Sequence, residues 1–302
     1  MIMRHWMDCP IVVTHGRLRE WQIFTKRKGE IPNKDTGEVT YDIDCYSRAV
    51  VLSGVTTEPI THEGLLEQFF VVNGEGVVIV AGQEKAIRPG SSFVLPSGAA
   101  HRIRNTGADD LEFILARRPP CADGSEDGFV IRHWTEERPE SQFGAPFQGH
   151  WNHIYRGPEA GIHVADLPPR KISHPHNHGP GLDEIWYIRK GNAYHWMGRE
   201  YQPQTPGCAL WLEPEEIHSL MNPSDETVEY IYCSSSALLS SRTPSAPEPA
   251  AEPSSREEII NALDAKFSDL VTAYQKTGIS VHGIGQNIGE VRKYIKMLKE
   301  PR

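Results

Sequence analysis

Histidines crowd one short stretch of this 302-residue chain, where His174, His176 and His178 fall within five residues. Side chains two positions apart on a β-strand point to the same face, so His176 and His178 would both project to one side. Glu184 follows in the apolar run Glu184-Ile-Trp-Tyr-Ile, which has the composition of the next strand. Imidazole nitrogens with a carboxylate oxygen are the mixed donor set that divalent first-row metals take. The stretch therefore predicts a metal site inside a β-structure.

The elements that would position these groups are short β-strands. Most of residues 40–235 consists of apolar runs separated by Gly, Pro and Asn turns, for example Glu67-Gln-Phe-Phe-Val-Val and Val228-Glu-Tyr-Ile-Tyr-Cys. Short strands at this spacing are typical of an all-β sandwich or barrel.

This β-region contains an internal repeat. Five chemically special residues recur at one offset of 117 positions: Glu67 and Glu184, Gly74 and Gly191, Gly90 and Gly207, His101 and His218, Asn105 and Asn222. A single offset kept by five such positions indicates a duplication. We expect two copies of one β-domain, over residues 40–120 and 150–235.

The repeated residues resemble the motifs of the cupin superfamily. The second cupin motif, G(x)5PxG(x)2H(x)3N, is complete in the first copy: Gly90, Pro96, Gly98, His101, Asn105. The second copy keeps it in part, as Gly207, Pro214, His218, Asn222. The first motif, G(x)5HxH(x)3–4E(x)6G, appears in the second copy with one extra residue before the carboxylate: His176, His178, Glu184, Gly191. The resemblance implies an all-β fold of two tandem jelly-roll barrels, a bicupin.

The second copy would hold the intact metal centre. Its ligands would be His176, His178, Glu184 and His218, and Glu184 is also the candidate catalytic base. Four protein ligands leave one or two positions open on a five- or six-coordinate ion. Polar residues in a degenerate barrel without metal are the alternative, but three buried His and a Glu would then lack partners for their charges and lone pairs. The ion could be Fe, Mn, Ni, Cu or Zn, because imidazole-rich sites accept most of this series.

His174 shares the parity of His176 and His178, and would replace one of them if the register shifted by two residues. The spacing to Glu184 favours the His176 and His178 pair. We therefore place His174 at the rim of the pocket.

The first copy departs from the motif. His62, Glu67 and His101 remain, but Ile60 stands where the first histidine should be, and no neighbouring residue replaces it convincingly. Two His and one carboxylate can still bind iron in a facial arrangement. Loss of a ligand in a duplicated domain equally fits a purely structural barrel, so both readings stay open.

Aromatic residues of the second copy would line the pocket. Trp186 has the parity of Glu184, and Tyr194 and Trp211 lie on strands that should pass close by. With His174 they would form a wall suited to a sugar face or an aromatic ring, although any one of them could belong to the barrel core. His195 and Arg199 would contact a substrate anion or be solvated hairpin residues.

The ends of the chain have other compositions. Residues 236–254 are rich in Pro, Ala and Ser and predict a flexible linker. Apolar residues then recur at helical spacing over 255–302, which predicts a tail of amphipathic helices. The tail would pack on its own barrel or a sister subunit, or dock a different protein. Residues 1–39 would supply an edge strand or a lid.

Charge and cysteine usage exclude several classes. The formal net charge of −9, without a Lys/Arg-rich run, argues against nucleic acid or an anionic membrane surface as partner. No apolar run approaches the ~20 residues of a membrane span. The five Cys lie far apart with no CxxC, which predicts reduced thiols in a cytoplasmic protein.

The resemblance leaves three functions to weigh, each with a small molecule as partner and a homo-oligomer formed through barrel edges or the tail. The favoured one is a metal-dependent dioxygenase-type oxidoreductase, since a three-His, one-Glu set beside aromatic walls resembles that branch of the superfamily. A metal-dependent sugar isomerase or lyase is close behind. A non-catalytic ligand-binding or scaffolding bicupin is the third.

Overall fold

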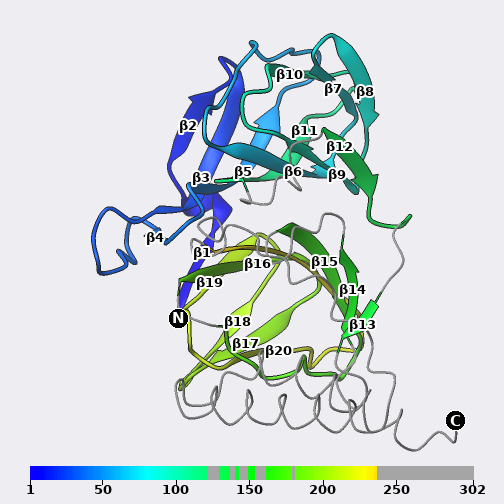
Figure 1. Cartoon of the computed structure of the whole chain (residues 1–302). Coiled ribbons are helices and arrows are strands. Elements are labelled where there is room, and N and C mark those ends of the chain that lie inside the picture. The colour runs from blue at the N-terminus through cyan, green and yellow to red at the C-terminus, as the bar shows by residue number, and fades with distance from the viewer. Residues whose placement is uncertain (121–128, 137–139, 143–148, 154–160, 179–180, 237–302) are drawn as a thin grey trace, which may run out of the picture.

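The computed structural model describes residues 1–120, 129–136, 140–142, 149–153, 161–178 and 181–236. These residues form β-strands and one short 3-10 helix, η1 (Trp6–Asp8). The strands gather into two barrels, one above the other in Figure 1, which confirms the all-β bicupin prediction. Apart from Ser236, the expected linker (236–254) and helical tail (255–302) lie outside the described residues. Within the described part of the chain, no helix has the length and apolar character needed to cross a membrane.

Barrel 1 consists of a large and a small sheet. The strands of the large sheet are, in spatial order, β12 (Val130–His133), β9 (Ser91–Leu95), β6 (Leu66–Asn73), β11 (Leu111–Arg118), β5 (Cys45–Val51), β3 (Leu18–Lys26) and β2 (Ile11–Thr14), with β4 (Glu38–Thr40) beside β3. The strands of the small sheet are β10 (His101–Asn105), β7 (Gly76–Val80) and β8 (Gln83–Ile87).

Barrel 2 repeats this arrangement. Its large sheet runs in the order β1 (Ile2–His5), β19 (Cys208–Leu212), β16 (Leu182–Lys190), β21 (Val228–Ser236), β15 (Gly161–Leu167), β14 (Gly149–His153) and β13 (Glu140–Gln142). Its small sheet contains β18 (Glu200–Gln204), β17 (Ala193–Met197) and β20 (His218–Met221). The series β9-β6-β11-β5 of barrel 1 thus corresponds to β19-β16-β21-β15 of barrel 2, as the sequence repeat requires.

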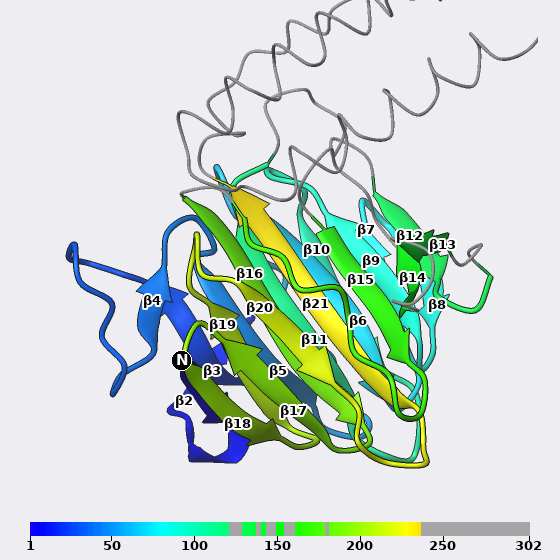
Figure 2. The same ribbon diagram turned by 90° about the horizontal axis from the view of Figure 1, so that it is seen from below.

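The two large sheets pack against each other, and Figure 2 shows their strands as overlying layers. One apolar cluster contains residues of both sheets, including Phe70 and Ile114 from barrel 1 and Ile185 and Ile231 from barrel 2. Two other clusters fill the barrel interiors, one around Phe69 and the other around Trp186. Central strands are therefore buried on both faces, and for this reason β6 contains the unbroken apolar run Phe-Phe-Val-Val over residues 69–72 rather than an alternating pattern.

The N-terminal segment joins both barrels. Strand β1 pairs antiparallel with β19 of barrel 2, with Ile2 opposite Trp211. After η1, the hairpin of β2 and β3 forms the edge of the large sheet of barrel 1. The prediction that this segment supplies an edge strand is correct, and it supplies one to each barrel.

A buried carboxylate ties barrel 2 to the loop between β4 and β5. Asp183, which is fully buried, accepts hydrogen bonds from the backbone N–H groups of Tyr41, Asp42 and Ile43 at 2.6 to 3.1 Å. It also accepts one from Trp211 Nε1 at 3.1 Å. Three successive N–H groups around one carboxylate form an anion-binding nest that fixes this loop to β16.

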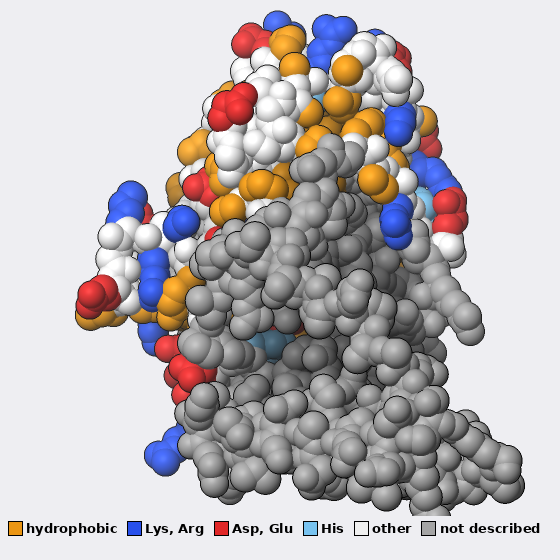
Figure 3. Space-filling model, in the orientation of Figure 1, with side chains coloured by type: hydrophobic (Ala, Val, Ile, Leu, Met, Phe, Trp, Pro, Cys, Tyr) orange, Lys and Arg blue, Asp and Glu red, His pale blue; other side chains and the backbone are white. Residues whose placement is uncertain are grey.

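The visible face of barrel 1 carries charges of both signs. Figure 3 shows Lys and Arg side chains interspersed with Asp and Glu across the described surface of the upper barrel. Single pairs such as Arg104 with Glu84, 2.7 Å apart, contribute to this pattern. A mixed surface of this kind gives no extended field for recruiting a polyanion.

Candidate metal centre

Barrel 2 brings together the four residues that the sequence singles out as ligands. His218 begins β20 and Glu184 lies on β16, while His176 and His178 lie in the segment before β16. His176 is held beside His218 by two backbone hydrogen bonds of 3.1 and 2.8 Å. One candidate ligand atom from each of the four residues lies within 4.8 Å of the others. The arrangement is compact enough for one ion to contact all four.

Hydrogen bonds at the outer side of the rings orient the imidazoles. His176 Nδ1 donates to the carbonyl of His174 at 2.8 Å, and His218 Nδ1 donates to the carbonyl of Glu216 at 3.0 Å. Because a carbonyl only accepts, each neutral ring carries its proton on Nδ1 and turns an Nε2 lone pair to the centre. His174, expected at the rim, contributes here through its backbone carbonyl.

Glu184 is oriented in a similar way. Trp186 Nε1 donates to Glu184 Oε1 at 2.7 Å, and Glu184 Oε2 lies against His178 Nε2. Burial alone raises the pKa of Glu184, but the His178 ring beside it, with His218 and His176 nearby, brings the pKa far below its usual value. The carboxylate is therefore ionised at neutral pH.

The buried donors fit a divalent cation. His218 is fully buried, and its Nε2 has no hydrogen-bond partner among the residues that the structure describes. Burial, with His176 and His178 nearby, lowers the pKa of His218, so its ring is neutral. An ionised carboxylate facing neutral imidazole lone pairs is the donor set of a divalent metal, and burying it without one would be costly.

The interior around these groups is apolar. Trp186 is fully buried, with its ring 5.6 Å from that of His218 and 4.9 Å from that of Tyr230. Leucines from two neighbouring strands, Leu212 and Leu220, belong to the same cluster. Trp186 thus lies in the barrel interior, as its parity with Glu184 predicts.

Two of the predicted pocket residues lie elsewhere. Trp211 is opposite Ile185, not Glu184, in the pairing of β19 with β16, and it packs between the barrels beside Tyr41. Tyr194 stacks on the half-exposed ring of Tyr201 at 4.9 Å, outside the barrel core. The structure thus places neither side chain beside the four donors. The expectation rested only on the strands passing close by, and the pairing register decides which residues of neighbouring strands share a face.

The residue of β17 that points inward is His195. It is fully buried, and its ring lies 5.1 Å from Trp186 and 6.3 Å from His218. The sequence left it as either an anion contact or a solvated hairpin residue, and burial excludes the solvated alternative. The alternation of β17, buried at Ala193, His195 and Met197, is the signal that identifies this face.

Burial lowers the pKa of His195 to about 3, and this predicts a pH-dependent stability. An unfolded histidine titrates near ~6.5, so below that pH the unfolded chain binds a proton that the folded chain refuses. Stability at pH 7 is therefore lost as pH falls, by about 1.4 kcal/mol per pH unit for this group between ~6 and ~3.

Urea unfolding with a metal chelator at pH 6.5, 5.5 and 4.5 measures this dependence. The unfolding free energy of the wild type should fall more steeply than that of His195→Gln, by about 1.4 kcal/mol per pH unit. Equal slopes for the two proteins would show that His195 is not the buried neutral group described above.

Barrel 1 also assembles its predicted residues, with one addition. Glu67 Oε2 lies 2.8 Å from His101 Nε2, and Glu67 Oε1 lies 3.2 Å from His62 Nε2. His15, from the turn between β2 and β3, contributes an Nε2 atom 3.0 Å from Glu67 Oε2. Hydrogen bonds from His101, His15 and His62 outweigh the effect of burial and hold the pKa of Glu67 well below its usual value. Sequence reasoning missed His15, which lies outside both cupin motifs.

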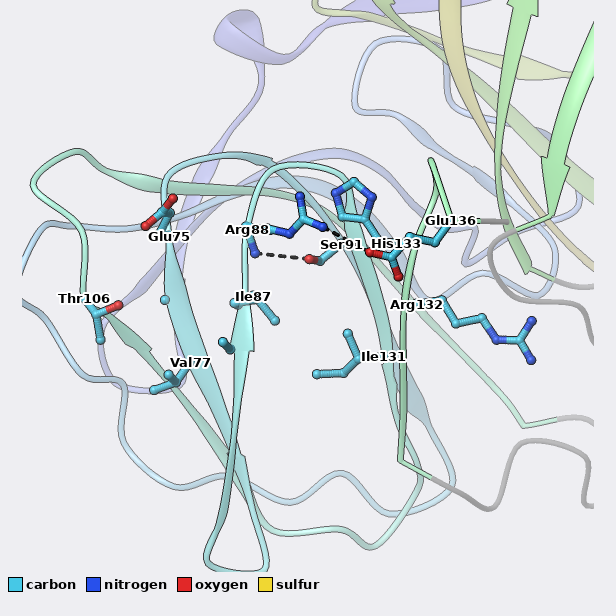
Figure 4. Close-up of a pocket in the computed structure, with 12 residues that line it drawn as sticks. Glu75, Val77, Ile87, Arg88, Ser91, Thr106, Ile131, Arg132, His133 and Glu136 are labelled. Atoms are coloured by element: carbon cyan, nitrogen blue, oxygen red, sulfur yellow. Dashed lines mark hydrogen bonds and ion pairs between the residues drawn. The ribbon is translucent and has the colours of Figure 1, made fainter. Parts of the chain in front are cut away.

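A separate cavity of about 400 Å³ lies on barrel 1, lined by residues of β7, β8 and β12 among others. Figure 4 shows Arg88 paired with two other lining residues, through its backbone N–H to the Ser91 hydroxyl and through its guanidinium to Glu136. Arg88 binds Glu136 at 3.1 Å, and His133 Nε2 donates to the carbonyl of Pro89 at 2.9 Å. Its lining includes none of the clustered metal-type ligands, so the barrel interiors remain the better candidates for chemistry.

Family comparisons agree with this architecture. Residues 48–117 match the family described as a cupin domain, and residues 169–281 match the family described as an AraC-like ligand-binding domain. The chain belongs to the cupin superfamily. Its two barrels make it a bicupin, with a family match to each barrel.

Solved structures resemble most of this chain in fold. A putative glyoxylate-induced protein from Pseudomonas aeruginosa superposes with a TM-score of 0.60 and 15% identity, over 78% of this chain and 84% of that one. A variant of oxalate decarboxylase from Bacillus subtilis gives 0.58 and 13%, over 78% and 79%. At identities this low, the similarity to this cupin shows a shared fold and nothing more.

A sequence relative is more similar over a shorter stretch. An oxalate-binding protein of Thermotoga maritima is 42% identical over 53 residues, which are 18% of this chain and 44% of that protein. The matched stretch of the bicupin therefore spans less than half the length of this relative.

Proposed function

We propose that this bicupin is a metal-dependent oxidoreductase of dioxygenase type, acting in barrel 2 on a small oxygen-rich organic acid or diketone. The observation that carries the proposal is the set of four donors, His176, His178, Glu184 and His218, facing one point inside an apolar interior. A divalent ion held there keeps one or two positions for substrate.

The residues of the chain have distinct tasks in this proposal. The three imidazoles and Glu184 hold the ion, which when bound supplies a Lewis acid and, if redox-active, electron exchange with O₂. Ionised Glu184 is placed to take a proton from the substrate. The indole of Trp186 fixes Glu184 and, with the surrounding leucines, keeps water from the reacting atoms. With a 1,3-diketone, a carbon–carbon bond breaks and both atoms of O₂ enter the two fragments. With oxalate, cleavage to two CO₂ releases two electrons that reduce O₂ to hydrogen peroxide. Neither reaction needs a separate reductant.

The substrate class is supported by what the similar proteins are named for. Oxalate and glyoxylate, which appear in those names, are small acids with oxygens on adjacent carbons. Such a molecule can occupy two neighbouring positions of a metal ion at once. The manganese centres named for the Bacillus subtilis decarboxylase also support a divalent metal in this fold.

A second candidate is a non-catalytic binder of the same small acids. The match of residues 169–281 to a ligand-binding domain and the likeness to an oxalate-binding protein favour it. It predicts binding without turnover, whereas an enzyme consumes its ligand.

Oxygen uptake separates these candidates. The full chain is loaded with Fe²⁺ or Mn²⁺ and mixed with oxalate, glyoxylate or a 1,3-diketone, with dissolved O₂, hydrogen peroxide and released CO₂ measured together. Uptake of one O₂ per substrate without hydrogen peroxide supports the dioxygenase, whereas one equivalent of hydrogen peroxide formed from oxalate would indicate an oxidase instead. Release of CO₂ without O₂ uptake would replace it by a non-oxidative decarboxylase, and saturable heat of binding without any product would favour the binder.

A further inference from the structure

We infer that barrel 1 holds a second metal site in which His15, from the N-terminal hairpin, supplies the ligand that Ile60 cannot. The other ligands are His62, Glu67 and His101. This site goes beyond the proposed function, because it lies in the other barrel and stands whatever reaction barrel 2 performs.

The backbone shows which ligand is missing. Ile60 and His101 exchange two backbone hydrogen bonds, both of 3.0 Å. His176 and His218 exchange the equivalent pair in barrel 2. Ile60 therefore occupies the backbone position of His176, and its side chain offers no donor atom to a cation.

His15 brings an imidazole into the same cluster from a different part of the chain. Its Nε2 lies 3.0 Å from Glu67 Oε2 and 3.3 Å from His101 Nε2. Candidate ligand atoms of His15, His62 and Glu67 all lie within 4.8 Å of one another. Two atoms bound to one ion at about 2.1 Å, with bond angles between right and tetrahedral, are about 3.0–3.5 Å apart. The separations of His15 Nε2 from Glu67 Oε2 and from His101 Nε2 both fall in this range.

The orientation of the His101 ring also fits a ligand role. His101 Nδ1 donates to the carbonyl of Ala99 at 2.9 Å, which directs Nε2 to the interior of the cluster. His101 Nε2 lies 2.8 Å from Glu67 Oε2, close enough for one ion to contact both atoms. His176 and His218 have the same outer hydrogen bonds in barrel 2.

A closed network fixes the His15 ring. Its Nδ1 contacts Thr14 Oγ1 at 3.0 Å, and the Thr14 hydroxyl donates to Glu20. Arg117 joins Glu20 to Glu67, with Nε 2.6 Å from Glu67 Oε1. Two carboxylates, Glu20 and Glu67, share the single charge of Arg117, so these three side chains carry a formal net charge of −1 beside the imidazoles.

The turn is shaped to present this side chain. His15 has a φ of +48°, in the left-handed region, and its side chain is fully buried. The adjacent Gly16 has a φ of +66°, and a Cβ there would lie 2.3 Å from the Glu58 side chain. A non-glycine residue held in this conformation stores on the order of 1 kcal/mol of strain, which a ligand role explains.

The segment that carries His15 also carries β1, which belongs to barrel 2. An ion bound by His15 would therefore pin the N-terminal segment to barrel 1 while β1 stays paired with β19. The four donors, three imidazoles and a carboxylate, suit a divalent first-row ion.

Metal counting tests the inference on the full chain. Chelator-treated proteins are loaded with Co²⁺, freed of excess by gel filtration, and analysed for cobalt per chain. We expect two equivalents for the wild type, one for His176→Ala/His218→Ala, and one for His15→Ala. Combining all three substitutions should leave none. His133→Ala, which removes a buried histidine outside both clusters, should keep two.

Two results would overturn the inference. One is the absence of cobalt from His176→Ala/His218→Ala while its circular dichroism stays that of the wild type. The other is one equivalent in that variant that persists when His15 is also replaced. A wild-type protein that binds two equivalents of cobalt but shows no turnover would contradict the proposed function and leave the second metal site standing. Turnover by a protein that binds cobalt in barrel 2 alone would contradict the second metal site and leave the proposed function standing.

A milder variant covers the case in which His15→Ala does not fold. Thr14→Val keeps the imidazole but removes its hydroxyl partner, and loss of such an outer contact weakens metal affinity by about 10–100-fold. In the His176→Ala/His218→Ala background, Co²⁺ titration followed by visible absorption should show this loss. An unchanged dissociation constant would contradict a ligand role for His15.

Discussion

Replacing Glu184 by glutamine is expected to remove the metal from barrel 2 and to lower metal-dependent turnover by at least about 10³-fold. The substitution takes away the charged ligand of the site, and the neutral imidazoles of His176, His178 and His218 then face the cation without a counter-charge. A bound ion supplies several kcal/mol of transition-state stabilisation, and each ~1.4 kcal/mol corresponds to a tenfold change in rate. Elemental analysis and product formation, measured on the same preparation, check both parts.

The folded state should tolerate this change. Glutamine has nearly the shape of glutamate, its amide oxygen can still accept the hydrogen bond from Trp186 Nε1, and a buried charge disappears. Glu213→Gln, at an exposed position between β19 and β20, is the matched control and should keep metal and turnover. A Glu184→Gln protein that retained full turnover would show that the reaction does not depend on this ligand.

A graded variant tests whether orientation of the carboxylate matters. Trp186→Phe keeps the aromatic wall but loses the 2.7 Å hydrogen bond to Glu184 Oε1. Removing such an outer contact should weaken metal affinity by about 10–100-fold without abolishing binding. The expected order of affinity is therefore wild type, Trp186→Phe, then Glu184→Gln.

The fold could be predicted from the repeat, because the repeated residues are of types that particular turns and site positions require. Glycine, histidine and asparagine recurring at one offset specify turns and site positions in both copies, and the strand orders β9-β6-β11-β5 and β19-β16-β21-β15 follow them. The same constraint brought Glu184 and His218 into one candidate site with His176 and His178.

What escaped prediction depends on long-range register. His15 meets Glu67 and His101 across 52 and 86 residues of sequence, from a hairpin that belongs to neither copy of the repeat. Its one local signal is a histidine placed directly before a turn glycine, Gly16, which is too common to single out. Trp211 was misplaced for a related reason, since only the pairing of β19 with β16 determines which of their residues share a face.

Replacing Asp183 by alanine is expected to lower the free energy of unfolding by about 3 kcal/mol or more. The carboxylate accepts from three consecutive backbone N–H groups, those of Tyr41, Asp42 and Ile43, and alanine would leave these donors without an acceptor. Each unsatisfied buried donor costs about 1–3 kcal/mol. Urea unfolding at neutral pH measures the change, and Asp225→Ala, which removes an exposed carboxylate paired with Arg170, should leave the unfolding free energy nearly unchanged.

The effect should reach the metal centre, because Asp183 and Glu184 are neighbours on β16 with side chains on opposite faces. Asp183 fixes the start of the strand to the loop of barrel 1, and Glu184 projects from the same stretch into barrel 2. A loosened anchor lets the carboxylate of Glu184 depart from its bonding position, so Asp183→Ala should weaken metal affinity as well as stability. Asp183→Asn, which keeps one acceptor oxygen, should lie between alanine and wild type in both measurements. Stability that falls while metal affinity stays at the wild-type value would limit Asp183 to holding the two barrels together.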